Sequence, residues 1–335
     1  MVDEIEGVVI MEHQLVNKLN NTEVTDSGAF SLEELLQGNA NNEVMTLNPT
    51  LQNDKVDYQQ IIQDSIKELN EVLLYAKVHK KVPLDLVNKK IIPGLSNMLH
   101  DLDLSRLFIA LQGKDNYTLH HSIAVGILSA LIGNWLKLSE RDRESLILAG
   151  LLHDIGKTLI PLEILNKPEK LLPGEYEVMK KHTILGYQIL KNTVGVSHRQ
   201  ALVALEHHER TDGSGYPLHL KGDRISQFGR IVAVADVFHA MSTHRVYHDA
   251  LPIYYVLDEL QQGLFGYFDP SIVSVFMKNM MEFLIGSHVQ LSNGQIGEII
   301  WINPVAPLRP LVRINDEFID LNANPLIYIK ELLGE

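Results

Sequence analysis

Side chains able to bind a metal ion recur along the middle of the sequence at a nearly constant spacing. They are His121, the pair His153 and Asp154, His182, the pair His207 and His208, and Asp236. Successive members lie 32, 29, 25 and 29 residues apart, which is about the length of one helix and its connection. Each helix can therefore deliver one ligand set to a shared level of a helical bundle.

The histidines share the apolar faces of the helices that we expect. His121 lies four residues before Val125, His182 lies seven before Ile189, and His208 follows alanines at helical spacing. Such spacing puts each imidazole on the buried side of its helix. A single buried histidine is usually a hydrogen-bonded core residue, but seven ionisable groups on one level would be costly to bury without an ion. The joint pattern therefore favours a metal site.

The donor types narrow the choice of metal. The sequence has no cysteine, which excludes disulfides, thiolate catalysis and cysteine-based zinc sites. Five imidazoles with two carboxylates suit iron, manganese or zinc and differ from the oxygen cage of calcium. Seven donors also exceed what one ion with open positions needs, so two ions bridged by a carboxylate fit the count.

Composition limits the function classes. A chain of 335 residues, 45% hydrophobic and 21% charged, suits a globular protein with one large domain and additions, or with two domains. A formal charge of −13 argues against a protein that wraps DNA or RNA, but it is compatible with binding of a small phosphorylated ligand. The N-terminus does not resemble a signal peptide, and the longest apolar stretch, 123–136, is shorter than the roughly 18 residues of a membrane helix. We therefore expect a cytoplasmic protein that has no membrane partner.

Hydropathy patterns divide the chain into four parts and predict a mainly α fold. Helical spacing of apolar residues runs from Tyr58 to about Leu284, whereas Asn293-Gly294 separates two β-favouring runs and predicts a hairpin. The predicted parts are a small, partly ordered N-terminal region at 1–55, N-terminal helices that form a linker at 56–100, a helical bundle at 101–285, and a small antiparallel β module at 286–335.

Three segments allow more than one interpretation. The run Val8–Met11 is β-like but stands in polar, Asn-rich sequence. The stretch "RIVAVAD" (230–236) alternates β-branched residues but continues into helical spacing, so we predict a helix. The apolar stripe of the predicted helix at 58–77 either packs on its own domain, which we favour, or pairs with a second copy in a homodimer.

Five motifs in order resemble the HD-GYP domain. They are "YTLHHS" (117–122), "LLHDIGK" (151–157), "MKKHTILG" (179–186), "HHERTDGSGYP" (207–217) and "VADVFHAMSTHRVY" (234–247). The resemblance spans about residues 100 to 285, and the ordered set is highly specific. That family belongs to the HD metal-dependent phosphohydrolases and hydrolyses the bacterial second messenger cyclic di-GMP. The resemblance therefore implies an HD-domain helical bundle and a cyclic di-GMP phosphodiesterase.

The resemblance also implies residue roles. Two divalent ions would be held, with iron expected first and manganese or zinc as alternatives; the ligands would be His121, His153, Asp154, His182, His207, His208 and Asp236. Asp154 would bridge the ions, and a bridging hydroxide would attack phosphorus. Lys157 would reach the scissile phosphate and Arg245 the other one. Tyr216 would contact the nucleotide from a loop that Gly213 and Gly215 let turn, and that loop could also bind a protein partner.

Several positions depart from the family pattern. His239 and His244 stand where the family usually has Asp, Val246 replaces Pro, and His248 replaces a basic residue. None of these changes removes a proposed metal ligand. We expect them to weaken substrate binding and the hydrogen bonds that orient Arg245. Tyr117 stands where members with a third metal carry Glu, so we expect two metals and the linear dinucleotide pGpG as the main product.

Three other functions stay open. The first is a cyclic di-GMP receptor of the same fold with weak or no turnover. The second is an HD phosphohydrolase for another nucleotide, which the GYP loop argues against. The third is a helical scaffold whose inward histidines bond to one another and bind no stoichiometric metal. The sequence does not identify the input signal.

Overall fold

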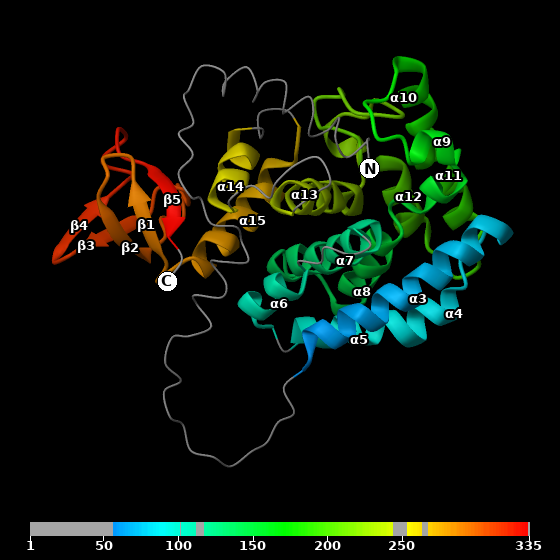
Figure 1. Ribbon diagram of the computed structural model, residues 1–335, viewed down its shortest axis with the longest axis horizontal. Coiled ribbons are helices and arrows are strands. Elements are labelled where there is room, and N and C mark those ends of the chain that lie inside the picture. The colour runs from blue at the N-terminus through cyan, green and yellow to red at the C-terminus, as the bar shows by residue number, and fades with distance from the viewer. Residues whose placement is uncertain (1–55, 101, 112–116, 244–252, 263–266, 334–335) are drawn as a thin grey trace, which may run out of the picture.

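Helices followed by one small sheet build the part of the chain that the structure describes (Figure 1). This computed structural model describes residues 56–335 apart from 101, 112–116, 244–252, 263–266 and 334–335. The mainly α fold with a C-terminal antiparallel sheet is confirmed. The predicted region 1–55 with Val8–Met11, and the positions His244, Arg245, Val246 and His248, lie outside the described residues.

The helices follow one another along the chain with short connections. Serine side chains cap several N-termini, as Ser139, Ser197 and Ser226 accept backbone N–H bonds. The helices are α3 (Tyr58–His79), α4 (Leu84–Leu86), the π-helical η1 (Val87–Ile91), α5 (Ile92–His100), α6 (Leu104–Leu111), α7 (Tyr117–Trp135), α8 (Glu140–Leu151), the 3₁₀ turn η2 (Ile155–Leu159), α9 (Leu162–Leu165), α10 (Pro173–Met179), α11 (Lys181–Lys191), α12 (His198–Glu206), the 3₁₀ turn η3 (Gly222–Arg224), α13 (Gln227–Ser242), α14 (Ile253–Gln262) and α15 (Pro270–Phe283).

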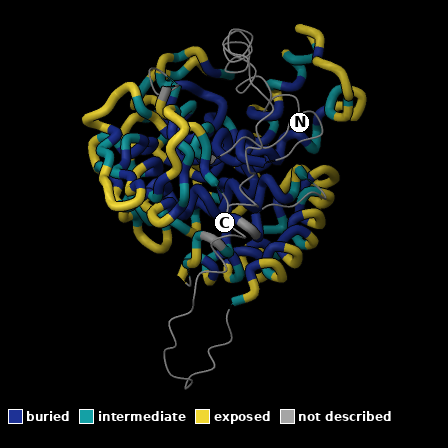
Figure 2. Tube along the Cα trace, turned by 60° about the vertical axis from the view of Figure 1, so that its left-hand side comes forward, coloured by how far each residue is buried: buried dark blue, intermediate teal, exposed yellow. Residues whose placement is uncertain are grey.

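Two helices, α7 and α13, form the centre of the bundle. On α7 every residue from His120 to Gly133 is buried, and on α13 nearly every residue from Phe228 to Ser242 is buried. Figure 2 shows that buried residues gather in the interior of the described chain and that exposed residues lie around them. A helix that is apolar on all sides is stable only inside a core. These two helices carry His121 and Asp236, and the prediction that "RIVAVAD" is helical is confirmed.

The apolar stripe of α3 packs on its own domain. Tyr58, Ile62, Leu69 and Val72 are buried in the same hydrophobic cluster as the residues of α7. This is the use of the stripe that we favoured. The alternative, a homodimer, stays a prediction.

The helical spacing of apolar residues around His182 runs without interruption, but the structure breaks the helix at Lys180 into α10 and α11. At the break, Nδ1 of His182 bonds to the carbonyl of Met179 at 2.9 Å, and Oγ1 of Thr183 donates to the carbonyl of Lys180 at 2.9 Å. Side chains that bond to nearby carbonyls compete with the backbone ladder. The break thus comes from the residue that the sequence marked as a metal ligand.

The C-terminal sheet is antiparallel throughout, in the order β4-β3-β2-β1-β5. The predicted hairpin at Asn293-Gly294 is confirmed, with Gly294 at φ +84° between the first two strands. The sheet shares the core of the helices, since Val289 is in the main hydrophobic cluster. The strands are β1 (His288–Leu291), β2 (Ile296–Trp301), β3 (Leu311–Ile314), β4 (Glu317–Asp320) and β5 (Ile329–Leu333).

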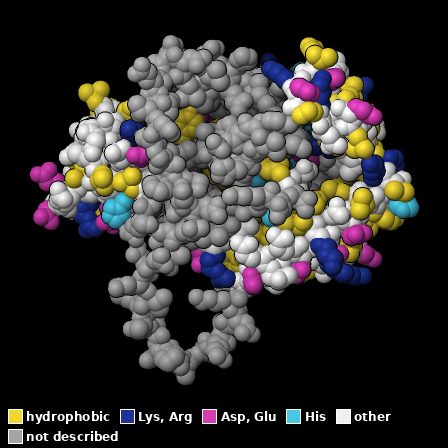
Figure 3. Space-filling view, viewed as in Figure 1, with side chains coloured by type: hydrophobic (Ala, Val, Ile, Leu, Met, Phe, Trp, Pro, Cys, Tyr) yellow, Lys and Arg dark blue, Asp and Glu magenta, His cyan; other side chains and the backbone are white. Residues whose placement is uncertain are grey.

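The described surface carries mixed charge. On the face shown in Figure 3, lysine and arginine side chains alternate with aspartate and glutamate over the described helices. Among the described residues, no helix combines the length and the apolar composition needed to cross a membrane.

Candidate metal centre

The structure brings all seven predicted metal-binding side chains together in the core. They form two groups: Asp154, His182, His207 and His208 in the first, and His121, His153 and Asp236 in the second. Within each group the ligand atoms lie within 4.8 Å of one another, and every member is buried. The members come from α7, α11, α13 and the segments that follow α8 and α12.

Ends of helices orient three of the imidazoles. Nδ1 of His153 lies 2.7 Å from the carbonyl of Gly150 at the end of α8, and Nδ1 of His207 lies 3.1 Å from that of Val203 in α12. Nδ1 of His182 is held likewise at the start of α11. Because a carbonyl only accepts, Nδ1 must carry the proton in each ring. Nε2 then faces the cluster and is available as a metal ligand.

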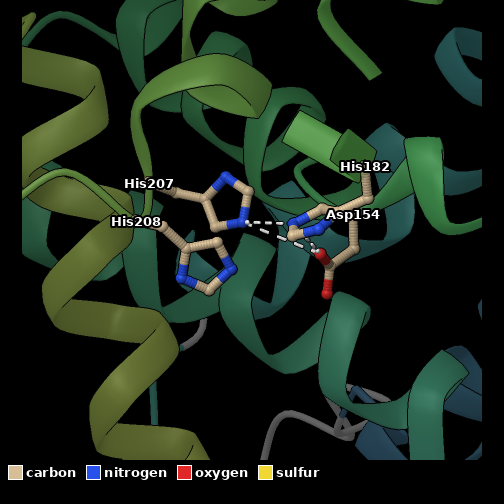
Figure 4. A group of neighbouring side chains, drawn as sticks. All are labelled: Asp154, His182, His207 and His208. Carbon is tan, nitrogen blue, oxygen red and sulfur yellow. Dashed lines mark hydrogen bonds and ion pairs between the residues drawn. The ribbon is translucent and has the colours of Figure 1, made fainter. Parts of the chain in front are cut away.

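Acceptor atoms crowd together in the first group. Nε2 of His182 and Nε2 of His207 are 3.4 Å apart, and they lie 3.3 and 3.7 Å from Oδ1 of Asp154 (Figure 4). Nε2 of His208 is buried and makes no hydrogen bond with any described residue. Lone pairs that face one another repel unless a cation lies between them. The first group therefore fits a divalent cation.

Protonation does not relieve this crowding. Burial lowers the pKa of the His207 imidazole to about 4. Burial, together with His207 and His182 nearby, also holds the pKa of His208 well below its usual range. Both rings are thus neutral near pH 7. Burial would raise the pKa of Asp154, but His153 and Lys157 hold it well below its usual range, so Asp154 is a carboxylate.

The second group centres on Asp236. Its Oδ1 lies 3.1 Å from Nε2 of His121, and although burial opposes the charge, the hydrogen bond of His121 lowers the pKa of Asp236. Burial would lower the pKa of His153, but the carboxylate of Asp154 outweighs it and raises that pKa. A cation bound to Nε2 of His153 would replace the proton that this ring otherwise binds beside the carboxylate of Asp154.

Asp154 faces both groups. Its Oδ1 points to His182 and His207, whereas its Oδ2 lies 3.0 Å from Nε2 of His153 in the second group. The C-terminal ends of α8 and α12, which carry partial negative charge, also meet here. Imidazole and carboxylate donors in this arrangement can hold divalent metal, and the donors alone do not fix its identity or number.

Lys157 follows Asp154 in the 3₁₀ turn η2. Its Nζ donates to Oδ2 of Asp154 at 2.9 Å, and its side chain is only 7% exposed. The lysine is thus buried and is not a solvated surface residue. It is buried beside the carboxylate, where it can meet an anionic group bound at the centre. Arg245, the other predicted phosphate contact, lies outside the described residues.

The glycine-rich loop after His208 returns to the centre. Gly213 has φ +85°, and a Cβ at Gly215 would lie 2.4 Å from the carbonyl oxygen of His208, so both positions need glycine. The ring of Tyr216 stacks on His208 with centroids 4.7 Å apart, and the Tyr216–Pro217 peptide is cis. Tyr216 therefore covers one imidazole of the first group.

The sequence reasoning missed the residue that fastens this loop. The buried carboxylate of Glu209 accepts from the backbone N–H of Leu218 at 2.6 Å and of Leu220 at 2.9 Å. A buried carboxylate with two charge-assisted bonds fixes a loop more firmly than neutral contacts do. The signal was present, because Glu209 stands inside the motif "HHERTDGSGYP", directly after the paired histidines.

Comparisons with known proteins agree with this geometry. Residues 107–272 match the family model described as HD domain. The chain is 34% identical over 206 residues to a cyclic di-GMP phosphodiesterase of Pseudomonas aeruginosa, which is 62% of this chain and 50% of the relative. It is 30% identical over 236 residues to 3'3'-cGAMP-specific phosphodiesterase 2 of Vibrio cholerae, which is 68% of this chain and 43% of the relative. The chain thus spans about half the length of the curated relatives that it matches.

A solved structure gives the same architecture. An HDG"Y"P protein from Bdellovibrio bacteriovorus superposes with a TM-score of 0.55 at 17% identity, over 75% of this chain and 77% of that chain. At this identity the likeness supports the fold alone.

Proposed function

We propose that the chain is a member of the HD-GYP family of HD-domain proteins and a metal-dependent phosphodiesterase that opens cyclic di-GMP; the match to the HD-domain model and the similarity to cyclic di-GMP phosphodiesterases support this. The observation that carries the proposal is the position of Asp154, whose two carboxylate oxygens face the two groups of histidines. Such a carboxylate is suited to bridge two cations. The proposed ligands are the seven residues of the two groups, with iron as the first metal to test and manganese and zinc as alternatives.

The chain's own residues would then bind and orient the phosphodiester. Two bound divalent cations would supply an activated water and offset the negative charge of the phosphate. The two carboxylates of the centre carry two negative charges, so the loaded site is positive although the whole chain carries −13. Lys157, buried beside Asp154, would donate to a phosphoryl oxygen and stabilise the charge that develops there.

The glycine-rich loop and Arg245 would hold the nucleotide. Tyr216 presents a ring beside His208, at the edge of the first group, where a base or sugar could pack. Arg245 would contact the second phosphate. Tyr117 stacks near His121 and is a poor ligand for a third cation, which favours the linear dinucleotide pGpG as the product.

Hydrolysis of two substrates tests the proposal. Purified protein loaded with iron or manganese under reducing conditions is incubated with cyclic di-GMP and, separately, with 3'3'-cGAMP, and the linear products are separated by chromatography. The second substrate is included because one similar protein is named for it. We expect cyclic di-GMP to be cleaved faster. Turnover of neither dinucleotide by metal-loaded protein would reject the enzyme.

A receptor without turnover remains the second candidate. The observation in its favour is His239, which stands where the family pattern has an acid and contacts His121 directly. Binding of cyclic di-GMP to metal-loaded protein with no linear product would support this alternative. A cytoplasmic location, a homodimer and a protein partner at the glycine-rich loop stay predictions.

A further inference from the structure

Arg210 is a buried cation beside the candidate metal centre. It stands in the motif "HHERTDGSGYP", two residues after His208, and only 8% of its surface is exposed. Its Nη1 donates to the carbonyl of His207 at 3.2 Å and to that of Glu209 at 3.0 Å. The central carbon of the guanidinium lies 5.2 Å from the centre of the Phe268 ring, as a cation–π contact. These contacts fix the position of the guanidinium.

The same contacts leave most of the guanidinium without an acceptor. A guanidinium has five N–H donors, and the two carbonyls are met by Nη1 alone. Nε and Nη2 of Arg210 donate to no described residue, and no described carboxylate lies close enough for an ion pair. Carbonyl groups are neutral, and a buried cation without a counter-charge is strongly unfavourable. The arrangement therefore favours an anion beside Nε and Nη2.

The charge of Arg210 reaches both groups of the centre. Burial lowers the pKa of Arg210, and Asp236 of the second group is the strongest of the charges that oppose this shift. In the first group, burial and the rings of His207 and His182 hold the pKa of His208 low, and the charge of Arg210 adds to their effect. Arginine stays a cation near neutral pH despite such a shift. An anion bound between the two groups would therefore lie within electrostatic range of Arg210.

We propose that Arg210 is a substrate-binding residue that donates from Nε and Nη2 to phosphoryl oxygens of the cyclic dinucleotide. This inference rests on the proposed function, because it takes a phosphodiester as the ligand of the centre. The planar fork of an arginine matches two oxygens of a phosphate. The bonds of Nη1 to backbone carbonyls orient this fork before substrate binds, which reduces the entropy lost on binding. Lys157 and Arg210 would then bind phosphate from two different segments of the chain.

The affinity for phosphate, measured apart from turnover, tests the proposal. Arg210→Met keeps an apolar side chain against Phe268 but removes the charge and the donors. At saturating metal, the Kd of the full chain for inorganic phosphate, measured by titration calorimetry, should rise by roughly 10- to 100-fold, and the KM for cyclic di-GMP should rise with it. Arg210→Lys keeps the charge without the fork and should give an intermediate Kd. An unchanged Kd for phosphate in Arg210→Met would overturn the inference.

Metal content separates substrate binding from support of the paired histidines. A residue that only held the backbone of that turn would affect metal binding when it is replaced. We expect both variants to keep the wild-type metal content per chain while their affinity for phosphate falls. Loss of metal with unchanged phosphate affinity at saturating metal would overturn the inference. Arg199→Met is the matched control, because Arg199 also lies over an aromatic ring, 4.1 Å from the centre of Phe228, but is exposed and paired with Asp142.

Inorganic phosphate also separates this inference from the proposed function. If metal-loaded wild type cleaves neither dinucleotide, the proposed function fails, whereas a higher Kd for phosphate in Arg210→Met would still support Arg210 as a phosphate-binding residue. Wild type that takes up metal but binds no phosphate would contradict the inference, and wild type that takes up no metal would contradict both. If Arg210→Met does not fold, as judged by circular dichroism, Arg210→Lys decides, because a Kd for phosphate equal to that of wild type would overturn the inference.

Discussion

The first and second groups form the two halves of the candidate metal centre, and these halves have similar donors but different supports. In the first half, Nδ1 atoms of His182 and His207 meet backbone carbonyls of Met179 and Val203. In the second half, Nδ1 of His121 meets a side chain, that of His239. A backbone carbonyl is present whatever residue carries it, so the first half depends on where helices begin and end. In the second half, His153 is likewise held by the carbonyl of Gly150, but the support of His121 depends on one residue type.

This difference indicates which side chains around such a centre can change without loss of a proposed metal ligand. The donors of both halves are retained, whereas the described departure from the family pattern, His239, is a support of the second half. A change of support alters affinity or protonation and leaves the ligand count intact. The two halves should therefore respond differently to mutation.

Substitution of the shared carboxylate should have the largest effect. Asp154→Asn removes the charge that faces both halves, and we expect hydrolysis of cyclic di-GMP to fall by roughly 1,000-fold or more, with weaker binding of both metal equivalents. Turnover and metal content by mass spectrometry are measured on the same sample. Asp223→Asn, at an exposed carboxylate, is the control and should behave as wild type. Two tightly bound metals in Asp154→Asn would show that the halves do not share it.

Removal of one donor from each half should separate the two halves. His207→Ala and His121→Ala should each lose one metal equivalent, and turnover should fall by roughly 100-fold in both because both cations act on the same phosphate. Metal content per chain, compared with wild type, checks this. Loss of both equivalents in both variants would mean that the centre loads as a single unit.

Metal removal should destabilise the fold, because the cations pair buried groups. At free metal about 100 times above Kd, each site contributes about 2.7 kcal/mol to the free energy of unfolding. Chelation of wild type should therefore lower the midpoint of thermal unfolding, and His121→Ala should lose about half of this metal-dependent stabilisation. An unchanged midpoint after complete removal of metal would contradict the assignment of these residues as ligands.

Loosening the glycine-rich loop should have the smallest effect. Glu209→Gln replaces one of the two carboxylate oxygens that hold Leu218 and Leu220 with an amide donor. We expect a loss of about 1–3 kcal/mol in stability and a KM raised by a few fold, with metal content unchanged. Steady-state kinetics and denaturant unfolding test this. Loss of metal from this variant would instead show that Glu209 helps to position the proposed ligands of the first half.

Most of the helices and all seven candidate ligands could be predicted from spacing and apolar faces. The places where helices break or end near the histidines could not be predicted in this way. The sequence pattern extends helices through His182 and His207, whereas the structure breaks one at Lys180 and ends another at Glu206. At Lys180, Nδ1 of His182 bonds to the carbonyl of Met179, and the backbone N–H of Thr183 pairs with Lys180 instead, a side-chain competition that no propensity scale contains. The roles of Arg245 and its neighbours stay predictions.

By itself the sequence determined which donors exist, their order, and the inward face of each helix, because periodicity of apolar residues fixes orientation about a helix axis. Only the tertiary structure decided which atoms meet. Whether Nδ1 of His121 lies 3.0 Å from His239, 118 residues away, depends on how α7 and α13 pack along and around their axes. Shifts of an ångström in that packing leave the sequence pattern unchanged but make or break the hydrogen bond.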